Sequence, residues 1–213
     1  MDIESAIKFP TEDEKWIGKI LIGGIISLIP IVNLLASGFY LKTMERTINR
    51  SSGMPEWEGW GELFIKGLVA AIICFLYLLI PMIVVIVAVV MVGGLASTVT
   101  ADTFANIFAM FSAIIIGGIL AIIFGFFIPM AMAMYVSSNS IGNAFKIGEV
   151  ISRIKSTLGD YLIAYVVIIV LAIVLSLIGS VPILGWIIAI FGSFYISVVA
   201  AKMFGDIYTA SSA

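Results

Sequence analysis

Long uninterrupted runs of apolar residues dominate the chain, and short polar segments separate them. Runs over residues 63–92, 103–136, 158–178 and 183–201 each fall within or above the range of roughly 17–25 residues that a helix needs to cross a bilayer. A transmembrane β-barrel would instead show short strands of alternating polarity. The pattern therefore predicts four long transmembrane helices.

The first apolar stretch, within residues 12–50, is interrupted by Pro30 and Asn33. It fits either a single kinked helix from Leu21 to Tyr40 or a hairpin that turns between its two halves. We favour the hairpin, because basic residues flank both ends and such residues collect on the cytoplasmic side. Each arm has at most about fifteen residues, or about 22 Å of helix, so the hairpin either spans or re-enters. Pro30 and Asn33 mark the candidate re-entrant turn.

Two amphipathic segments lie between the apolar runs. The first, residues 54–62, gathers tryptophan, acid and glycine, and its spacing predicts a helix lying in the membrane interface. Its candidate functional residues are Pro55, Glu56, Trp57, Trp60 and Glu62. The second, residues 139–156, predicts another interfacial helix. Near the start of the chain, Thr11 and Glu14 form the pattern of a capping box, which predicts that a helix begins near residue 12.

Small residues recur every four positions along two of the predicted spans, and such stripes let helix backbones approach closely in lipid. We expect packing within the chain, while a contact between copies or a lipid-lined groove is the alternative. The two striped helices are expected to be partners. The stripes consist of Ala113, Gly117, Ala121 and Gly125 in one span and of Gly185, Ala189, Ser193 and Ser197 in the other.

A weak internal repeat links the first hairpin to the last. The sequence Pro30-Ile31-Val32 corresponds to Pro182-Ile183-Leu184, and each begins a returning helix that later carries a Phe-Tyr pair. The pairs are Phe39-Tyr40 and Phe194-Tyr195, at different distances from their prolines. Repeats of this kind occur in transporters, and they are also a general feature of membrane folds.

Composition supports the same class of protein. Of 213 residues, 62% are hydrophobic and 11% are charged, whereas soluble domains average about 25% charged residues. A soluble fold with so few charges would leave its apolar surface uncovered. We therefore predict a single all-α integral membrane domain over residues 1–213.

Lysine and arginine fall only within residues 8–19, 42–66, 146–155 and 202. All of these lie on one side if the first apolar stretch is a hairpin, which predicts a multi-pass protein of the cell membrane with both termini in the cytoplasm. The acidic start of the chain lacks the basic region of a cleaved signal peptide.

Candidate chemistry is sparse. The chain has no histidine and one cysteine, Cys74, and the spans carry no acid or base between their ends. Proton relays and ion-coupled transporters usually need such groups at membrane depth. We therefore expect no catalytic residue, metal or cofactor. The net charge of −2 also gives no reason to expect nucleic acid as a partner.

Several motifs in the first 70 residues together resemble one family. They include Trp16-Ile17-Gly18-Lys19, the turn Ile29-Pro30-Ile31-Val32-Asn33, Gly38-Phe39-Tyr40 and Met54-Pro55-Glu56-Trp57, followed by Trp60-Gly61-Glu62-Leu63-Phe64 and Gly67. This combination resembles an uncharacterised polytopic membrane family, domain of unknown function 4013. The resemblance implies a multi-pass membrane protein and assigns no activity to any residue.

These observations favour a non-enzymatic membrane protein, acting as a helix-packing accessory or scaffold or as an oligomeric component. Its expected partners are the lipid bilayer and either further copies of the chain or another membrane protein. The alternative is a transporter or channel-like protein that handles lipids or small solutes. An intramembrane enzyme would need a nucleophile with its base, or metal ligands, at membrane depth, and the sequence places none of these side by side.

Overall fold

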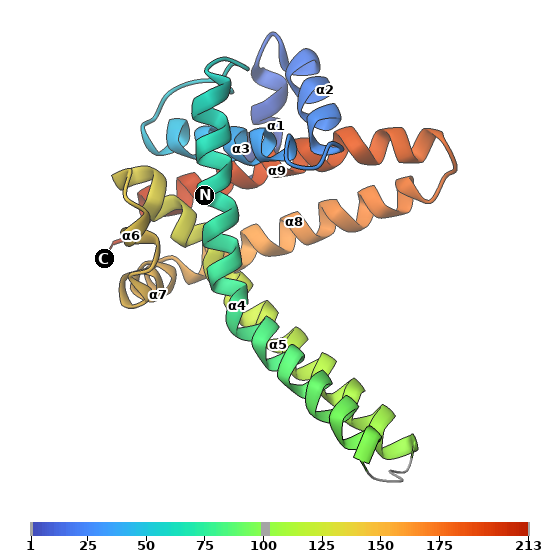
Figure 1. Cartoon of the computed structure of the whole chain (residues 1–213). Coiled ribbons are helices and arrows are strands. Elements are labelled where there is room, and N and C mark those ends of the chain that lie inside the picture. Colours follow the sequence, from blue (N-terminus) through green and yellow to red (C-terminus); the bar gives the residue numbers. More distant parts are fainter. Residues whose placement is uncertain (1, 99–102, 213) are drawn as a thin grey trace. The chain divides into compact units, whose positions relative to one another are not determined.

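The computed structural model describes residues 2–98 and 103–212, with side chains for residues 2–91 and 107–212. Within these residues every regular element is a helix, as predicted for an all-α fold, and there is no strand (Figure 1). The elements in order are α1 (Ile3–Lys8), η1 (Phe9–Glu12, a 3-10 helix), α2 (Trp16–Ser27), α3 (Asn33–Ile48), α4 (Trp60–Thr98), α5 (Thr103–Ser138), α6 (Ile141–Ala144), α7 (Ile147–Ser156), α8 (Leu158–Gly179) and α9 (Leu184–Ala210).

Four helices of the described chain are long and apolar enough to cross a membrane, which agrees with the predicted fold class. The qualifying stretches are Trp60–Met91, Ile107–Ser138, Leu158–Gly179 and Leu184–Ala210. The chain divides into two compact units. Unit 1 comprises residues 1–71 and 129–213, and unit 2 comprises residues 72–128.

The C-terminal half of α9 forms the core of unit 1. Between Phe194 and Ile207 this helix buries residues on every side, and α1, α2, α3 and α8 all pack against it (Figure 1). Its N-terminal half is different, because Trp186 and Ile188 are exposed. One helix is therefore a protein core at one end and an apolar outer surface at the other.

Glycines allow the helices of unit 1 to lie very close together. A methyl group added at Gly38 of α3 would lie 1.8 Å from the Leu63 carbonyl oxygen, and one at Gly67 of α4 would lie 1.7 Å from the Leu34 oxygen. On α2, Gly23 lies directly against the ring of Phe194. These contacts hold α3 backbone to backbone against the start of α4.

The first apolar stretch is a hairpin, as favoured from the sequence, and the single kinked helix is excluded. Helix α2 ends at Ser27 and α3 begins at Asn33, with Ile31 between them at φ 70°. A positive φ recurs between α8 and α9, where Ile183 has φ 65° and ψ −68°. Both Pro-Ile turns thus reverse the chain through an isoleucine with a positive φ.

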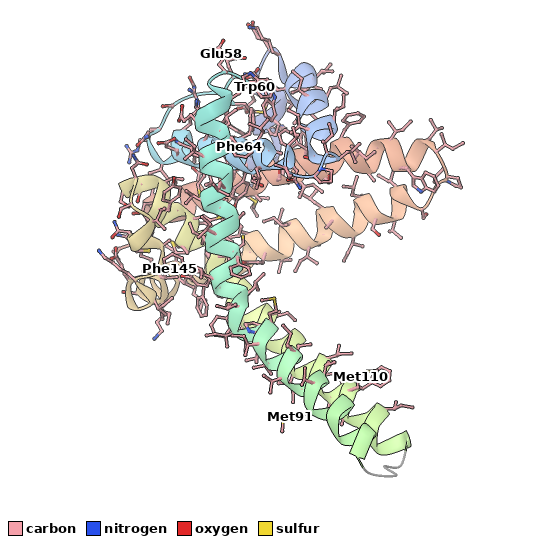
Figure 2. All side chains as sticks on the ribbon, in the orientation of Figure 1. Glu58, Trp60, Phe64, Met91, Met110 and Phe145 are labelled. Carbon is pink, nitrogen blue, oxygen red and sulfur yellow. The ribbon has the colours of Figure 1, made fainter. Side chains whose placement is uncertain are left out.

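Unit 2 consists of the α4 and α5 segments that form an antiparallel pair. Ala113 of α5 is buried, and a methyl group added at Gly117 would lie 2.1 Å from Cγ2 of Val85 on α4. One added at Gly118, about 100° further around α5, would meet no atom within 4 Å. Figure 2 labels Met91 and Met110 on this pair, and both side chains are exposed.

Three local predictions were wrong. The capping box does not form, because α2 begins only at Trp16 and the Thr11 hydroxyl donates to the Lys8 carbonyl at 2.7 Å. Residues 54–59 are not helical, and α4 begins at Trp60. Residues 139–156 do not form one helix, because the chain breaks at Phe145 and Lys146 between α6 and α7.

Candidate functional site

Residues 51–59 join α3 to α4 as a segment without regular structure, which we call the strap. Gly53 and Gly59 both have positive φ, 71° and 65°, a conformation that glycine adopts without strain. Between them, Met54 and Pro55 are buried against the helices of unit 1. This backbone path explains why the tryptophan-rich segment is not the helix that its spacing predicted.

The ammonium group of Lys19 on α2 is the polar centre beneath the strap. The side chain is only 4% exposed, and its Nζ lies 2.7 Å from Oδ2 of Asp13 and 2.9 Å from Oε1 of Glu56. It also donates to the Met54 carbonyl oxygen at 3.3 Å. A buried charge is tolerated only when it is paired and hydrogen-bonded, and Lys19 meets both conditions. We call Lys19, Asp13 and Glu56 the clamp.

Asp13 supplies the more deeply buried carboxylate of the clamp. Burial alone would raise its pKa, but hydrogen bonds from Lys19, Lys15 and Met54 and the charge of Lys19 hold the pKa below its ordinary value of 3.8. Its Oδ1 accepts the Lys15 backbone amide at 2.9 Å. Asp13 is therefore ionised near neutral pH and ties the segment before α2 to the strap.

An aromatic cluster lies beside the clamp. The Trp57 ring from the strap stacks on Phe39 of α3 with centroids 4.4 Å apart, and its Nε1 donates to the Lys19 carbonyl at 3.0 Å. Phe194 of α9 lies 5.5 Å from Phe39 and 5.9 Å from Trp57. Phe39 and Phe194, which the sequence repeat made equivalent, are thus direct neighbours in the core.

A second ionic group joins α3 to the start of α4. Lys66 binds Glu45 of α3 and lies 3.2 Å from Glu62, while Glu62 also accepts from Lys42 at 3.2 Å. The Lys66 side chain is 11% exposed, so this group is partly screened from solvent. It lies next to the Gly38 and Gly67 contacts in the sequence and holds the same two helices together.

The candidate residues of the tryptophan-rich segment have different surroundings. Pro55 is buried, Glu56 belongs to the clamp, Trp57 is half-buried in the aromatic cluster, and Glu62 belongs to the second ionic group. Trp60 is 47% exposed, and Figure 2 shows it with Glu58 at the beginning of α4. The expected site therefore belongs to the packing between helices and strap.

Sequence reasoning missed the residues that organise this region. Neither Lys19 nor Asp13 was among the candidate site residues. The available signal was a lone lysine inside the apolar first stretch, preceded by three acids and followed in the chain by a further acid next to tryptophan. Arg46 was also missed. Its guanidinium donates to the carbonyls of Ser52 and Gly53 and fixes the N-terminal end of the strap.

The two stripes of small residues make contacts inside their own hairpins. Gly117 faces Val85 of α4, while a methyl group added at Gly185 would lie 2.1 Å from the Ile178 oxygen of α8. Ala121 and Gly125 are partly exposed, and an added methyl group at Gly125 would meet no atom within 4 Å. Gly117 and Gly185 thus each contact a neighbour within their own hairpin.

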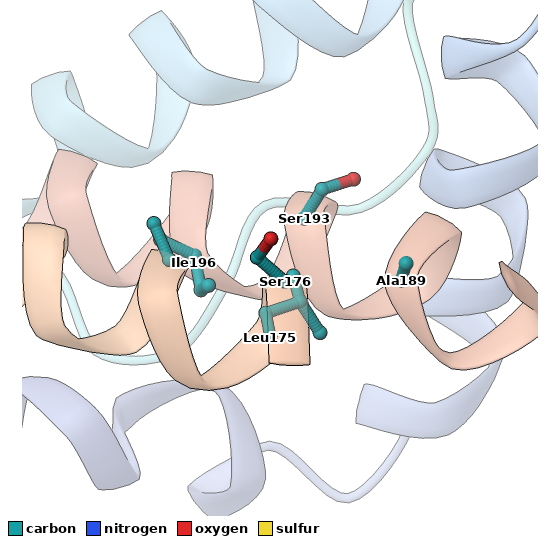
Figure 3. Close-up of a pocket in the computed structure, with 6 residues that line it drawn as sticks. Leu175, Ser176, Ala189, Ser193 and Ile196 are labelled. Carbon is teal, nitrogen blue, oxygen red and sulfur yellow. The ribbon is translucent and has the colours of Figure 1, made fainter. Parts of the chain in front are cut away.

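A shallow apolar groove of about 350 Å³ runs between α8 and α9. Figure 3 shows its walls, which include Ser193 and Ala189 from the second stripe. The Ser193 hydroxyl donates to the Ile190 carbonyl of its own helix at 2.7 Å, and Ser197 likewise donates to Phe194. The groove is lined by Ala172, Leu175, Ser176, Ala189, Ser193 and Ile196.

The candidate re-entrant turn has an exposed apolar tip. Leu28, Ile29 and Ile31 are 60%, 47% and 72% exposed, and Pro30 is exposed beside them. Asn33 begins α3, and its backbone amide donates to the Ile29 carbonyl at 2.9 Å. The tip is thus suited to contact acyl chains or another apolar surface.

Neither ionic group has the form of a catalytic centre in which a nucleophile lies beside a base. Each contains a lysine shared by two carboxylates, which is an arrangement that fixes position. Within the described residues, no group of three or more histidine, cysteine or acidic side chains is placed to hold a metal ion.

Of the comparisons with known proteins, only the one with protein families gives a match. No curated protein and no solved structure matches the chain. A family model described as protein of unknown function (DUF4013) matches residues 22–184. This match covers most of the chain, including α3, α8 and both Pro-Ile turns. The chain is therefore a member of the DUF4013 family of proteins of unknown function.

Proposed function

We propose that this protein is a non-enzymatic component of the cell membrane that assembles by helix packing, either with further copies of itself or with another membrane protein. In this proposal both termini lie in the cytoplasm, together with the strap and the clamp. The polar groups of unit 1 support it, because their ion pairs join the chain's own helices and strap.

The outer face of α5 in unit 2 is the observation that carries the proposal. Phe111, Ile114 and Ile122 are 57%, 50% and 75% exposed, and their spacing places them on one face with Gly118. No atom lies within 4 Å of a methyl group added at Gly118. A glycine framed by large apolar side chains lets another transmembrane helix approach closely.

The test uses two neighbouring glycines whose side-chain directions differ by about 100° around α5. Gly118→Leu would obstruct the outer face, whereas Gly117→Leu would collide with Val85 inside the pair. We expect native mass spectrometry of the gently solubilised protein to show a defined complex that Gly118→Leu dissociates into folded monomers. Gly117→Leu should instead lower the thermal stability of the protein. A monomeric wild type, or a complex unaffected by Gly118→Leu, would contradict the proposal.

Handling of lipids or small solutes is the second candidate, and the groove between α8 and α9 favours it. Its apolar walls and partly exposed small residues fit an acyl chain (Figure 3). In a bilayer, however, any apolar groove of this kind is filled by lipid, so occupancy alone does not indicate transport. Lipid scrambling or solute flux in liposomes, lost on Ala189→Phe and retained in Ile188→Phe, would establish this candidate. Folded protein without either activity would rule out this second candidate.

A further inference from the structure

The strap is attached to unit 1 mainly through side chains. The backbone bonds to helix ends lie at its borders, from the Ser51 amide to the Arg46 carbonyl and from the Leu63 amide to the Gly59 carbonyl. Between these points it is held by Arg46, by Lys19 and by the Trp57 indole. Segments with few backbone hydrogen bonds open locally at a lower free energy than the helices beneath them.

The Lys19 clamp is the attachment that contains ion pairs, so its effect depends on the charge of its carboxylates. When one partner of a buried ion pair is neutralised, the other charge remains in a poorly solvated place, which is strongly unfavourable. Lys19 can regain solvent most directly if Met54 and Glu56, both in the strap, move away from it. Asp13 also accepts a hydrogen bond from the Met54 backbone amide, so neutralising Asp13 weakens a direct attachment of the strap as well as its pairing with Lys19.

We propose that residues 51–59 are a releasable strap, which opens as a local unit when the Lys19 clamp is broken and uncovers the aromatic face of Phe39 and Phe194. The helices remain packed, since α2 and α3 contact α9 through residues outside the strap, including the Gly23–Phe194 and Gly205–Thr47 contacts. This inference does not depend on the proposed assembly role.

The charged groups around the clamp set the direction of its pH dependence. Asp13 precedes α2, Glu56 lies in the strap, and Arg46 of α3 binds the strap carbonyls. From α9, Lys202 is paired with Asp206 and lies 5.8 Å from the Phe9 ring centroid. The exposed Lys15 contributes its backbone amide to Asp13.

The Asp13 pKa is lowered in the folded protein, so ionised Asp13 stabilises the closed strap above the ordinary value of 3.8. That contribution is lost as the pH falls through the lower folded pKa. Acid therefore opens the strap, and an uncharged residue at position 13 opens it at neutral pH.

Hydrogen exchange followed by mass spectrometry on the full chain in nanodiscs tests this inference. Asp13→Asn is expected to lower the protection factors of residues 51–59 at neutral pH by about tenfold or more, as expected for loss of a hydrogen bond to a charged group. Protection of residues 194–207 should not change. Lys15→Met is the matched control, because it removes an exposed lysine next to Asp13, and it should exchange like the wild type.

Two further measurements make the result decisive. Acidification below pH 3.8 should lower protection of the strap in the wild type and lower it less in Asp13→Asn, where the carboxyl group that titrates is absent. If Asp13→Asn fails to fold, Glu56→Gln replaces it, with a smaller decrease because Glu56 is half exposed. Unchanged protection in the substituted protein, or a strap that exchanges only together with residues 194–207, would overturn the inference.

Discussion

The hairpins α2–α3 and α8–α9 both reverse at a Pro-Ile pair, with isoleucine φ angles of 70° and 65°. Their arms differ greatly, because α2 has 12 residues and α8 has 22. The short hairpin is fastened by the clamp, the second ionic group and the aromatic cluster. In the long hairpin, α8 buries only Tyr161 and Ala164, both near its start.

This difference shows how a chain reversal at a Pro-Ile pair serves two environments. A helix of 12 residues is about 18 Å long, which is less than the bilayer core of about 30 Å, so α2 depends on the surrounding protein. Helix α8 is about 33 Å long and can be stabilised by lipid along most of its surface. The polar contacts of the first hairpin therefore supply the stabilisation that its short helix α2 cannot obtain from lipid.

The largest expected effect is at the backbone contact of the short hairpin. Gly38→Ala places a methyl group 1.8 Å from the Leu63 oxygen, so α3 and α4 must separate, and we expect a loss of about 4 kcal/mol or more. Thermal unfolding in detergent measures this loss. Gly18→Ala is the control, because that methyl group meets no atom within 4 Å and should leave stability equal or slightly higher. Equal stability of the two variants would contradict the close contact between α3 and α4.

The next effect separates the two halves of α9. Phe194 is 3% exposed in the aromatic cluster, and Phe194→Ala should lower the free energy of unfolding by about 3 kcal/mol. Ile188 is 49% exposed near the tip of the long hairpin, and Ile188→Ala should lower it by less than about 1 kcal/mol. Denaturation of both variants under the same conditions gives the difference. Similar losses would show that the two hairpins are stabilised alike.

Acid should weaken the short hairpin selectively. Because the Asp13 pKa is lowered in the folded protein, its contribution is complete well above 3.8 and disappears as the pH falls below this value. A profile of thermal stability against pH should therefore decline in acid for the wild type and decline less for Asp13→Asn. We expect a smaller change than for Phe194→Ala. Parallel profiles would mean that Asp13 does not stabilise the fold.

The smallest effect tests whether the two turns are equivalent. Isoleucine at positive φ is strained by roughly 1–3 kcal/mol, and glycine relieves this strain while adding freedom to the unfolded chain. Ile31→Gly and Ile183→Gly should therefore each raise stability by roughly 1 kcal/mol. Ile29 does not have a positive φ, so Ile29→Gly should slightly lower stability. A gain in stability at one turn and a loss at the other would show that the two turns are not equivalent.

The predictions from sequence succeeded where the pattern was long and regular. Four apolar runs became four helices of membrane-crossing length, and the hairpin over residues 12–50 formed. The short polar segments were predicted less well. Trp57 was assigned to a helix by its spacing, but Phe39 and the Lys19 carbonyl hold it in the strap. Thr11 was assigned to a helix cap, but Asp13 binds Lys19 and helix α2 begins later.

The sequence by itself determined the class of protein, its long helices and its turns, because these depend on local hydrophobicity and on residues such as Pro30 and Pro182. Only the tertiary structure decided that Phe39 meets Phe194 and that Lys19 binds carboxylates from both Asp13 and the strap. The physical reason is that a buried ion pair forms between residues far apart in the chain, and its stability depends on the surroundings that the packed helices provide.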